Sequence, residues 1–273
     1  PRLDQFFGFG IHKYEALIRE ALQNSRDNKI DESTEAVLLS IRIRKVSKSV
    51  FMSLFRDDIR HWKKCGVDVE KIVDNPDNRR VAFFEDFNTK GLRGKPGPYN
   101  LERMSPWAAF FQGTGLTTKT GKGQGGAFGV GKTVYASASQ FKAFVAYTIR
   151  VEDEDPDGLL MGQAILDPHQ LETEKSRYEP IGVFCHDRDE DGFVLPYDGE
   201  EARQIADMIG FERQAGEPGM SVAVMCPRED VNERNLVKAT LEHFHYQIAM
   251  GEVEVSIQDD DGHPEGHLLN AET

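Results

Sequence analysis

Residues 18–27 read Ile-Arg-Glu-Ala-Leu-Gln-Asn-Ser-Arg-Asp, and the other motifs of the chain are best understood in relation to them. At 3.6 residues per turn, Glu20, Asn24 and Asp27 fall on one stripe of a helix, beside an apolar surface that begins at Leu17. A carboxylate, an amide and a second carboxylate on one stripe could hold a divalent cation and a water molecule. The solvated polar face of an ordinary amphipathic helix has the same pattern. The stretch therefore predicts a helix that packs on a sheet, and its chemistry depends on the motifs downstream.

Composition limits the classes of protein to consider. The chain has 273 residues, of which 39% are apolar and 29% charged, enough for one large domain or a domain with a small addition. No apolar run approaches the length of a membrane span, and no signal peptide is visible. Three scattered cysteines without metal-ligand spacing indicate a reducing, cytoplasmic setting. Because the first residue is Pro1, we expect a processed or engineered start and a fragment of a longer protein.

The net charge of −13 argues against a surface that coats nucleic acid. Basic residues between Arg42 and Lys64 are a local exception, and they predict either a solvated strand face with a helix or a small docking patch.

Hydrophobic periodicity predicts the elements of a mixed α+β fold. Strands are expected at 35–46, 81–84, 141–151, 159–166, 181–185, 221–226 and 253–257, and helices at 14–28, 49–64, 105–113, 133–139, 200–211 and 231–250. Short links between consecutive strands favour a mixed, mostly antiparallel sheet with helices on one face, in a two-layer sandwich. We expect an N-terminal arm at 1–14, a main domain at 15–228, and a helix, a strand and an acidic tail at 229–273 that begin a linker or transducer region.

The segment 126–133 satisfies the phosphate-loop pattern G-x-x-x-x-G-K-[ST]. A phosphate loop must follow a buried strand, yet the residues before Gly126 are polar and rich in glycine. Downstream, Ile149-Arg150-Val151-Glu152-Asp153 is a poor match to the strand that ends in a metal-binding aspartate. These glycines and Lys132 can still bind phosphate through a loop that leads into a helix N-terminus.

Four motifs in one order resemble those of the Bergerat-fold, or GHKL, ATPase superfamily. The first is Glu20-x-x-x-Asn24-x-x-Asp27, the second is Asp86 with Gly91, and the fourth is the strand end at Ser221. The third contains the lid residues, which resemble the versions in heat-shock-chaperone-like, MORC-like and MutL-like ATP-binding proteins: Gly125, Gly126, Phe128, Gly129, Val130, Gly131 and Lys132. The second motif departs from D-x-G-x-G, because Asn88 stands at the first glycine position and the last glycine comes one residue late. Asparagine tolerates left-handed backbone angles, so we expect the turn to survive.

The resemblance implies a site for ATP and Mg²⁺ and a role for each motif. Glu20 would act as general base on the attacking water, and Asn24 would ligate Mg²⁺. Asp27 would bind or tune the helix, Asp86 would accept the adenine amino group, and the Ser221 hydroxyl would support the base site. The lid glycines would wrap the phosphates, since glycine lets the backbone approach closely, and Lys132 would neutralise phosphate charge.

The function that this resemblance implies is slow ATP hydrolysis that drives lid closure, a conformational change or the formation of an ATP-dependent homodimer. A setting in bacterial anti-phage defence or DNA processing rests on family analogy, and partner proteins or DNA would bind through regions outside this fragment. Three alternatives stay open: a histidine-kinase-type catalytic domain, a nucleotide-gated binding module without turnover, and a phosphate-loop NTPase. No membrane partner is expected.

Overall fold

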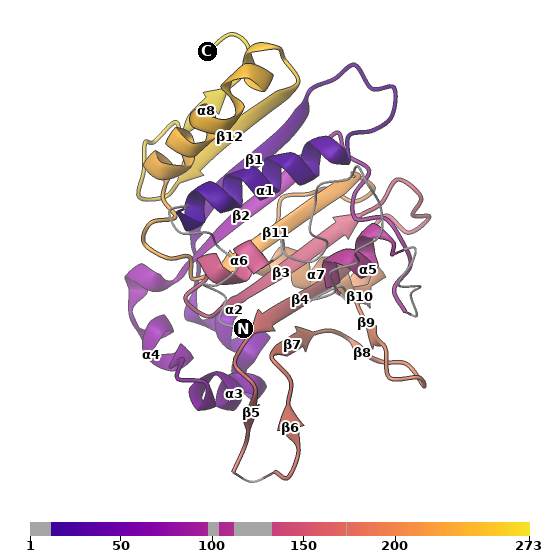
Figure 1. The fold of residues 1–273 in the computed structure, drawn as a ribbon, viewed down its shortest axis with the longest axis vertical. Helices are drawn as coiled ribbons and strands as arrows, with labels where there is room; N and C mark the ends of the chain where they lie inside the picture. The colour runs from indigo at the N-terminus through magenta and orange to yellow at the C-terminus, as the bar shows by residue number, and fades with distance from the viewer. Residues whose placement is uncertain (1–11, 98–103, 112–132, 173) are drawn as a thin grey trace, which may run out of the picture.

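The computed structural model describes residues 12–97, 104–111, 133–172 and 174–273. These residues form an α+β fold with a large mixed, mostly antiparallel sheet and packed helices (Figure 1). The strands of this sheet are β1 (Val37–Lys45), β2 (Arg80–Phe87), β3 (Ala143–Ile149), β4 (Leu159–Ile165), β7 (Ile181–Phe184), β10 (Tyr197–Asp198), β11 (Gly219–Met225), β12 (Val253–Asp259) and β13 (His267–Leu269). Among the described residues their order is β10-β4-β3-β11-β2-β1-β12-β13, with β7 also paired to β4.

The helices match most of the predicted ranges. They are α1 (Lys13–Asp27), α2 (Lys48–Phe55), α3 (Ile59–Lys64), α4 (Val69–Asp74), α5 (Pro106–Phe111), α6 (Thr133–Ala138), α7 (Gly199–Ile209) and α8 (Glu233–Ala249), with 3₁₀ turns at Arg56–Asp58 and Pro76–Asn78. The single helix predicted over 49–64 is instead divided into α2 and α3 by the first of these turns. No helix within the described ranges is long and apolar enough to cross a membrane.

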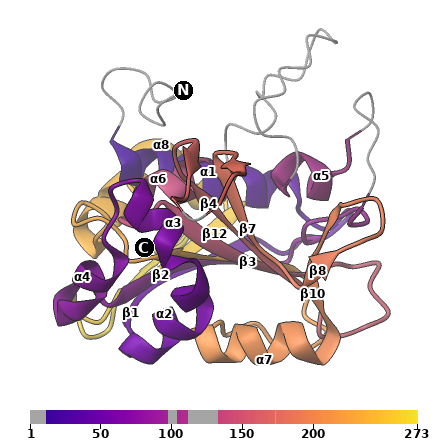
Figure 2. The ribbon, with the colours of Figure 1, turned by 90° about the horizontal axis from the view of Figure 1, so that it is seen from below.

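The prediction of helices on one face, in two layers, is wrong. Figure 2 shows α1, α5, α6 and α8 on one face of the sheet and α2 and α7 on the other. Side chains alternate along β2, so that Phe84 packs in the core under α1 and Phe83 packs in the second core under α7. The central strands β2, β3 and β11 are buried on both sides, and each face therefore needs its own cover of helices.

The segment 229–273 extends the same sheet. β12 pairs in parallel with β1, from Val37 opposite Val253 to Ile43 opposite Asp259, and β13 adds an antiparallel strand beyond it. α8 crosses back beside α1, as the yellow and indigo ends of the chain show in Figure 1. The N-terminal helix α1 and the C-terminal elements α8, β12 and β13 thus lie together at one end of the sheet.

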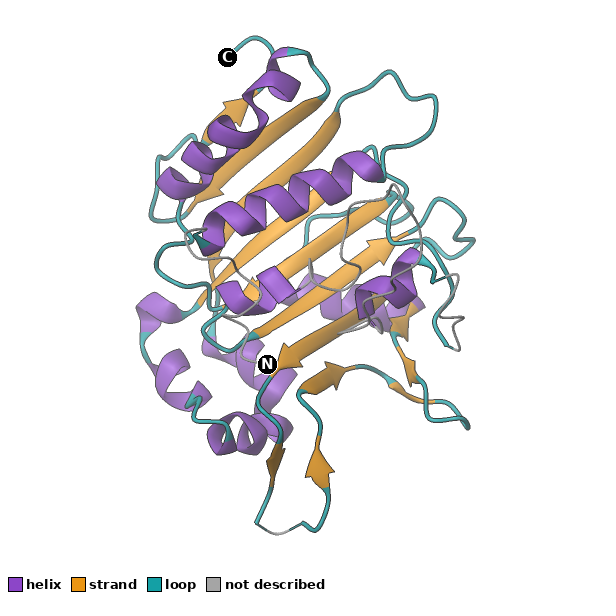
Figure 3. Ribbon diagram, viewed as in Figure 1, coloured by secondary structure: helices purple, strands orange, loops and turns teal. Residues whose placement is uncertain are grey.

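Two short hairpins extend from the other end of the sheet (Figure 3). They pair β5 (His169–Gln170) with β6 (Arg177–Tyr178), and β8 (Asp187–Arg188) with β9 (Val194–Leu195). The sequence did not predict them, because strands of two residues are too short to establish a period.

The basic residues between Arg42 and Lys64 are largely paired with acidic side chains. Arg44 binds Asp260 at 3.0 Å, and Lys48 binds Asp74 at 2.6 Å. These contacts favour a solvated strand face over a docking patch for nucleic acid.

Candidate functional site

Helix α1 holds the first motif against the sheet. Leu17, Ile18 and Leu22 are fully buried in the core, and this apolar face fixes the rotation of the helix. Glu20 and Asn24 are half-buried at the side of α1, whereas Asp27 is exposed at its last turn. The stripe predicted from the sequence therefore leads from the protein interior to solvent.

Glu20 and Asn24 are joined directly. The Asn24 side-chain nitrogen donates a hydrogen bond of 2.8 Å to Glu20 Oε1, and the amide oxygen of Asn24 is the acceptor of this side chain. Burial raises the pKa of Glu20 above its ordinary value; the bond from Asn24 opposes this shift, and the nearby charge of Asp27 adds to it. A carboxylate that prefers its protonated form is a stronger base when it is ionised.

Asp86 lies near the end of β2 and is anchored by three elements. Its Oδ1 accepts hydrogen bonds from the Thr89 hydroxyl at 2.6 Å and from the Met220 backbone N–H at 2.7 Å. Its Oδ2 accepts one bond of 3.1 Å, from the Ser25 hydroxyl of α1. Only 8% of the residue is exposed. Oδ1 is saturated by protein donors, so Oδ2 is the oxygen that retains capacity to accept from a ligand.

Ser25, which was not among the site residues predicted from the sequence, connects the first and second motifs. It lies one residue after Asn24, on the buried side of α1, and its single hydroxyl hydrogen is shared between Asp86 Oδ2 and the Ala21 carbonyl, which lies 2.8 Å from the hydroxyl oxygen. A small polar residue on the apolar face of a predicted helix was the signal in the sequence.

Tyr135 is a second residue near the candidate site that was not predicted from the sequence. It is buried on α6, and burial raises its pKa well above the ordinary value, with further increases from the charges of Glu20 and Asp86. The Tyr135 ring packs against Phe84 of β2, two residues before Asp86, with the ring centroids 6.2 Å apart. One aromatic side chain in a helix of small residues was its signal in the sequence.

The loop after Asp86 keeps its turn without the expected first glycine. Asn88 has φ +61°, and its side chain donates a bond of 2.7 Å to the Ala36 carbonyl. This confirms the prediction that asparagine adopts the left-handed conformation there. Gly91 has φ +71°, and a Cβ on it would overlap the Ile149 carbonyl oxygen. Glycine is therefore required where this loop passes over β3.

Thr148 of β3 closes the same loop. Its hydroxyl accepts from the Leu92 N–H at 2.8 Å and donates to the Gly219 carbonyl at 2.9 Å. The contact joins the second motif to the start of β11. Thr148 was not predicted as part of the site, because a threonine within an alternating strand carries no separate signal in the sequence.

The structure does not bring Ser221 to the Asp86 carboxylate. Ser221 lies opposite Glu85 in the antiparallel register, and its hydroxyl donates to Glu85 Oε2 at 2.7 Å. Neighbouring residues of a strand point to opposite faces, so Glu85 and Ser221 face the second core while Asp86 faces α1. The contribution of this strand to Asp86 is the backbone N–H of Met220.

Behind Asp86 lies a buried ionic network that the sequence did not indicate. Arg213 is 1% exposed, donates from Nε to the Ser221 hydroxyl at 3.0 Å, and binds the backbone carbonyl of Asp86. Glu85 pairs with Arg42 and accepts from the Glu212 N–H at 3.2 Å. Burial lowers the pKa of Arg213, and the charges of Asp86 and Glu85 oppose this effect. The network fixes the backbone on which the Asp86 carboxylate is held.

The third motif lies outside the described residues. This applies to all seven lid positions predicted from the sequence, Gly125, Gly126, Phe128, Gly129, Val130, Gly131 and Lys132, and to residues 1–11 of the N-terminal arm. The described part begins again at Thr133, the first residue of α6.

Asp153, the aspartate of the poor match to a metal-binding strand end, closes a turn. Its carboxylate accepts hydrogen bonds from the backbone N–H and from the side chain of Arg150, both at 2.7 Å.

Few side chains of the candidate site could act as ligands for a metal ion. In the described ranges, no group of three or more His, Cys, Asp or Glu side chains could hold a metal ion. The amide oxygen of Asn24, next to the Glu20 carboxylate, fits a Mg²⁺ ion that keeps most of its water ligands and binds a phosphate-bearing ligand.

No protein-family model matches the chain, and a search of curated proteins found no match.

Proposed function

We propose that this chain is a cytoplasmic, Mg²⁺-dependent ATP-binding domain of the GHKL type that hydrolyses ATP slowly. The observation that carries the proposal is the Ser25–Asp86 hydrogen bond of 3.1 Å. It connects the helix bearing Glu20 and Asn24 to the strand end bearing Asp86, which supports the proposal that the water-activating and base-binding motifs form one site. The proposed resemblance to GHKL domains is limited to the face of the sheet that α1, α6 and α8 cover. The helices on the second face depart from the two-layer pattern.

Asp86 would recognise the base. The free acceptor capacity of Oδ2 suits the exocyclic amino group of adenine, while Thr89 and Met220 keep the carboxylate oriented. Guanine carries a carbonyl oxygen at the corresponding position, and two facing acceptors repel each other. A site built around an ionised acceptor therefore favours adenine.

Glu20 would accept a proton from the attacking water. Its raised pKa makes the ionised form a better base, and Asn24 holds the carboxylate by one oxygen and leaves Oε2 for the water. Mg²⁺ supplies charge neutralisation to the phosphates when it is bound. Asn24 would hold the ion, and the lid from Gly125 to Lys132 would cover the phosphates.

Turnover and binding assays on a small set of variants test the proposal. Glu20→Gln should retain Mg·ATP affinity and lose about 10²–10⁴ of the hydrolysis rate. Glu15→Gln makes the same change on the same helix, in its first turn, and should leave both unchanged. Asp86→Asn should lose ATP affinity, whereas Asp68→Asn should not, because asparagine can replace the helix cap that Asp68 forms for α4.

The remaining alternatives predict different results. Binding without turnover in the wild type would indicate a nucleotide-gated binding module. Loss of binding in Lys132→Ala, with normal behaviour of both carboxylate variants, would indicate a phosphate-loop NTPase. Transfer of the phosphoryl group to a protein histidine would indicate a kinase.

The proposed cycle includes closure and association of two copies. Under it, the mass of the particle in solution should double when a non-hydrolysable ATP analogue and Mg²⁺ are added, and the Asp86→Asn variant should not respond. Light scattering measures this directly, and a monomer in both conditions removes dimerisation of this chain from the proposal.

A further inference from the structure

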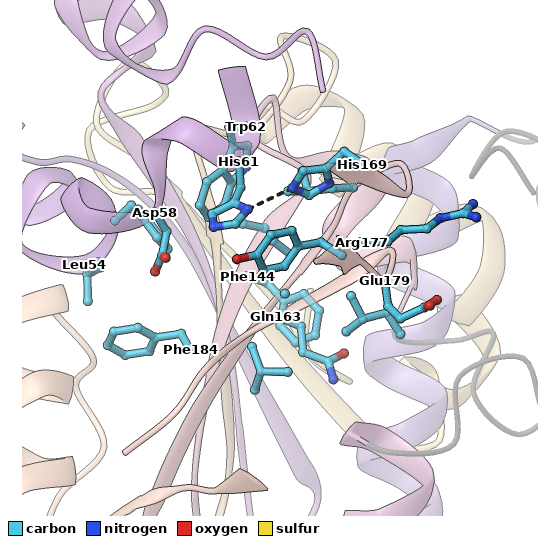
Figure 4. A pocket seen from close by; sticks show the side chains of 18 of the residues that line it. Leu54, Asp58, His61, Trp62, Phe144, Gln163, His169, Arg177, Glu179 and Phe184 are labelled. Carbon is cyan, nitrogen blue, oxygen red and sulfur yellow. Dashed lines mark hydrogen bonds between the residues drawn. The ribbon is translucent and has the colours of Figure 1, made fainter. Parts of the chain in front are cut away.

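A cavity of about 390 Å³ lies around the edge strand β7, next to the β5–β6 hairpin (Figure 4). Its lining residues come from both faces of the sheet, and one part lies under α2 and α3, on the face opposite α1. The walls of this part are apolar side chains that belong to the second core or pack against it: Leu54, Phe55, Trp62, Ala164, Leu166 and Phe184. We call this part the α3 pocket.

Gly182 leaves room in the α3 pocket. It lies opposite Ala164 across the β4–β7 pair, and its backbone lacks the left-handed angles that require glycine. A Cβ on Gly182 would meet only atoms of Ala164, the nearest at 3.8 Å. A strand glycine that the backbone does not require often marks a place where another molecule approaches closely. The space over Gly182 is therefore available to a ligand.

The two histidines beside the pocket are joined in a way that fixes their protons. The Asp167 carbonyl lies 2.9 Å from His169 Nδ1, and because a carbonyl can only accept, this nitrogen carries a proton. Nε2 of neutral His169 is then an acceptor, so His61 Nδ1 donates to it across 2.8 Å. Burial lowers the pKa of His61, and the charge of Asp58 opposes this shift. The second nitrogen of neutral His61, Nε2, is therefore an acceptor.

His61 Nε2 and the Asp58 carboxylate are open to a ligand. His61 Nε2 is not among the unpaired side-chain atoms that the described fold seals from water. Asp58 is the N-cap residue of α3, where it is exposed and makes no side-chain capping bond. Residues three apart on a helix lie on the same side, so the two acceptors are neighbours. Figure 4 shows Asp58, Leu54 and Phe184 on the far side of His61 from His169.

Two arginines, Arg177 and Arg188, also line the cavity and would by themselves favour an anion. Both are exposed, and the guanidinium of Arg188 donates to the Gly192 carbonyl of its own hairpin at 2.8 Å. An anion in the α3 pocket would also face the Asp58 carboxylate and the lone pair of His61 Nε2, and both repel it. The pocket therefore favours a ligand that donates.

Two neighbouring acceptors, one of them a carboxylate, match an ammonium group, which has three N–H donors and the opposite charge. We propose that the α3 pocket binds a small organic primary amine. Its ammonium group donates to Asp58 and to His61 Nε2, and its apolar part packs over Gly182 against Leu54 and Phe184. The apolar walls supply affinity, and the two acceptors supply orientation.

Three probes with the same ring and different head groups test the proposal: benzylamine, benzyl alcohol and benzoate. In a titration at pH 7 followed by methyl NMR, benzylamine should shift the Leu54, Ala164 and Leu166 signals in a saturable way and leave Leu236 of α8 unshifted. Benzyl alcohol should bind about tenfold more weakly, because it lacks the charge-assisted hydrogen bond, and benzoate more weakly still. Equal affinities of the amine and the alcohol, tighter binding of benzoate, or no saturable shift at about 5 mM benzylamine would overturn the proposal.

A pair of matched variants tests the role of the carboxylate. Asp58→Asn keeps the shape of the side chain and a residue that caps helices equally well, so α3 should be retained. It should lower the affinity for benzylamine about tenfold, to that of benzyl alcohol. Asp57→Asn removes the neighbouring exposed carboxylate of the same 3₁₀ turn and should leave the affinity unchanged. Unchanged binding in Asp58→Asn would contradict the proposal.

A blocking variant tests the location. Gly182→Val fills the space over the strand with a residue that favours strands, and it should abolish binding of benzylamine. Val183→Ile adds one methyl group on the opposite face of β7 and should leave binding unchanged. Unchanged methyl signals from Leu236 would show that Gly182→Val is folded. Benzylamine binding to that folded variant would contradict the proposed location, and if it does not fold, the Asp58 and Asp57 variants decide.

Discussion

The guanidinium group of Arg213 lies behind Asp86, donating to its backbone carbonyl and standing 3.8 Å from its carboxylate Oδ1. A buried cation thus holds the main chain of the residue whose side chain faces the α1 side of the sheet. Arg213 also packs over the Phe87 ring, 4.7 Å from its centroid. The loop after α7, in which the sequence shows no motif, is therefore part of the support of the candidate site.

Removal of this cation should destabilise the fold strongly. Arg213→Met leaves the Ser221 hydroxyl and the carbonyls of Asp86 and Met220 without this donor, and loss of one partner of a buried pair costs about 3–5 kcal/mol in the free energy of unfolding. Urea denaturation measures this change. Arg26→Met, which breaks the exposed pair with Glu252, is the matched control and should cost less than about 1 kcal/mol. Equal losses would show that the network does not stabilise the fold.

Gly91 and Gly66 have nearly the same backbone conformation and different surroundings. Their φ angles are +71° and +77°, but a Cβ on Gly91 would overlap the Ile149 carbonyl, whereas one on Gly66 meets nothing within 4 Å. Gly66→Ala should cost about 1 kcal/mol from backbone strain alone, and Gly91→Ala about 3 kcal/mol or more. Thermal unfolding of both variants measures the difference, which disappears if the loop can move away from β3.

The raised pKa of Glu20 predicts a pH-dependent stability. Its ordinary value is 4.5, and the folded state holds the proton to higher pH than the unfolded state does. As pH rises from 4.5 through the folded pKa, the unfolded state binds fewer protons and the free energy of unfolding falls. Glu20→Gln lacks this contribution, so its stability relative to wild type should increase between pH 4 and pH 7. A flat difference for Glu20→Gln across this pH range would exclude the shift.

Asp86→Asn should change the choice of base as well as the affinity. Thr89 and Met220 both donate to the Oδ1 position, so the asparagine oxygen should occupy it and the NH₂ group should replace Oδ2. A donor then faces the ligand where an acceptor stood. The preference for ATP over ITP, whose base has a carbonyl at that position, should fall by about tenfold or more. Competition binding with both nucleotides tests this, and an unchanged preference would place the base elsewhere.

Much of the fold could be predicted from the sequence because its core elements carry a clear period. The apolar face of α1 and the alternation of β1 and β3 place these elements within a few residues of their observed bounds. The second layer of helices could not be predicted in the same way. Val81, Ala82, Phe83 and Phe84 form a continuous apolar run, and such a run shows that a strand is buried without showing that helices cover both of its faces.

The candidate site was predicted in part, for a related reason. Glu20, Asn24 and Asp86 lie in short motifs, and the structure places them in one region. Ser221 is in the correct strand but faces away from Asp86, because a shift of one residue reverses the direction of a side chain. Arg213 binds Asp86 from the loop after α7, and Tyr135 packs against Phe84 from α6. Both come from elements far away in sequence, and only the packed fold shows these contacts.

The parallel pairing of β1 with β12 affects the order in which this chain can fold during its synthesis. The two strands are separated by 216 residues, as are Arg44 and Asp260 at their ends. At roughly 5–20 residues per second, a ribosome needs about 10–40 s to deliver the second strand after the first. Until then β1 presents an open hydrogen-bonding edge, which is the feature that recruits wrong strands. Chaperone capture of the nascent chain would be of greatest use in this interval.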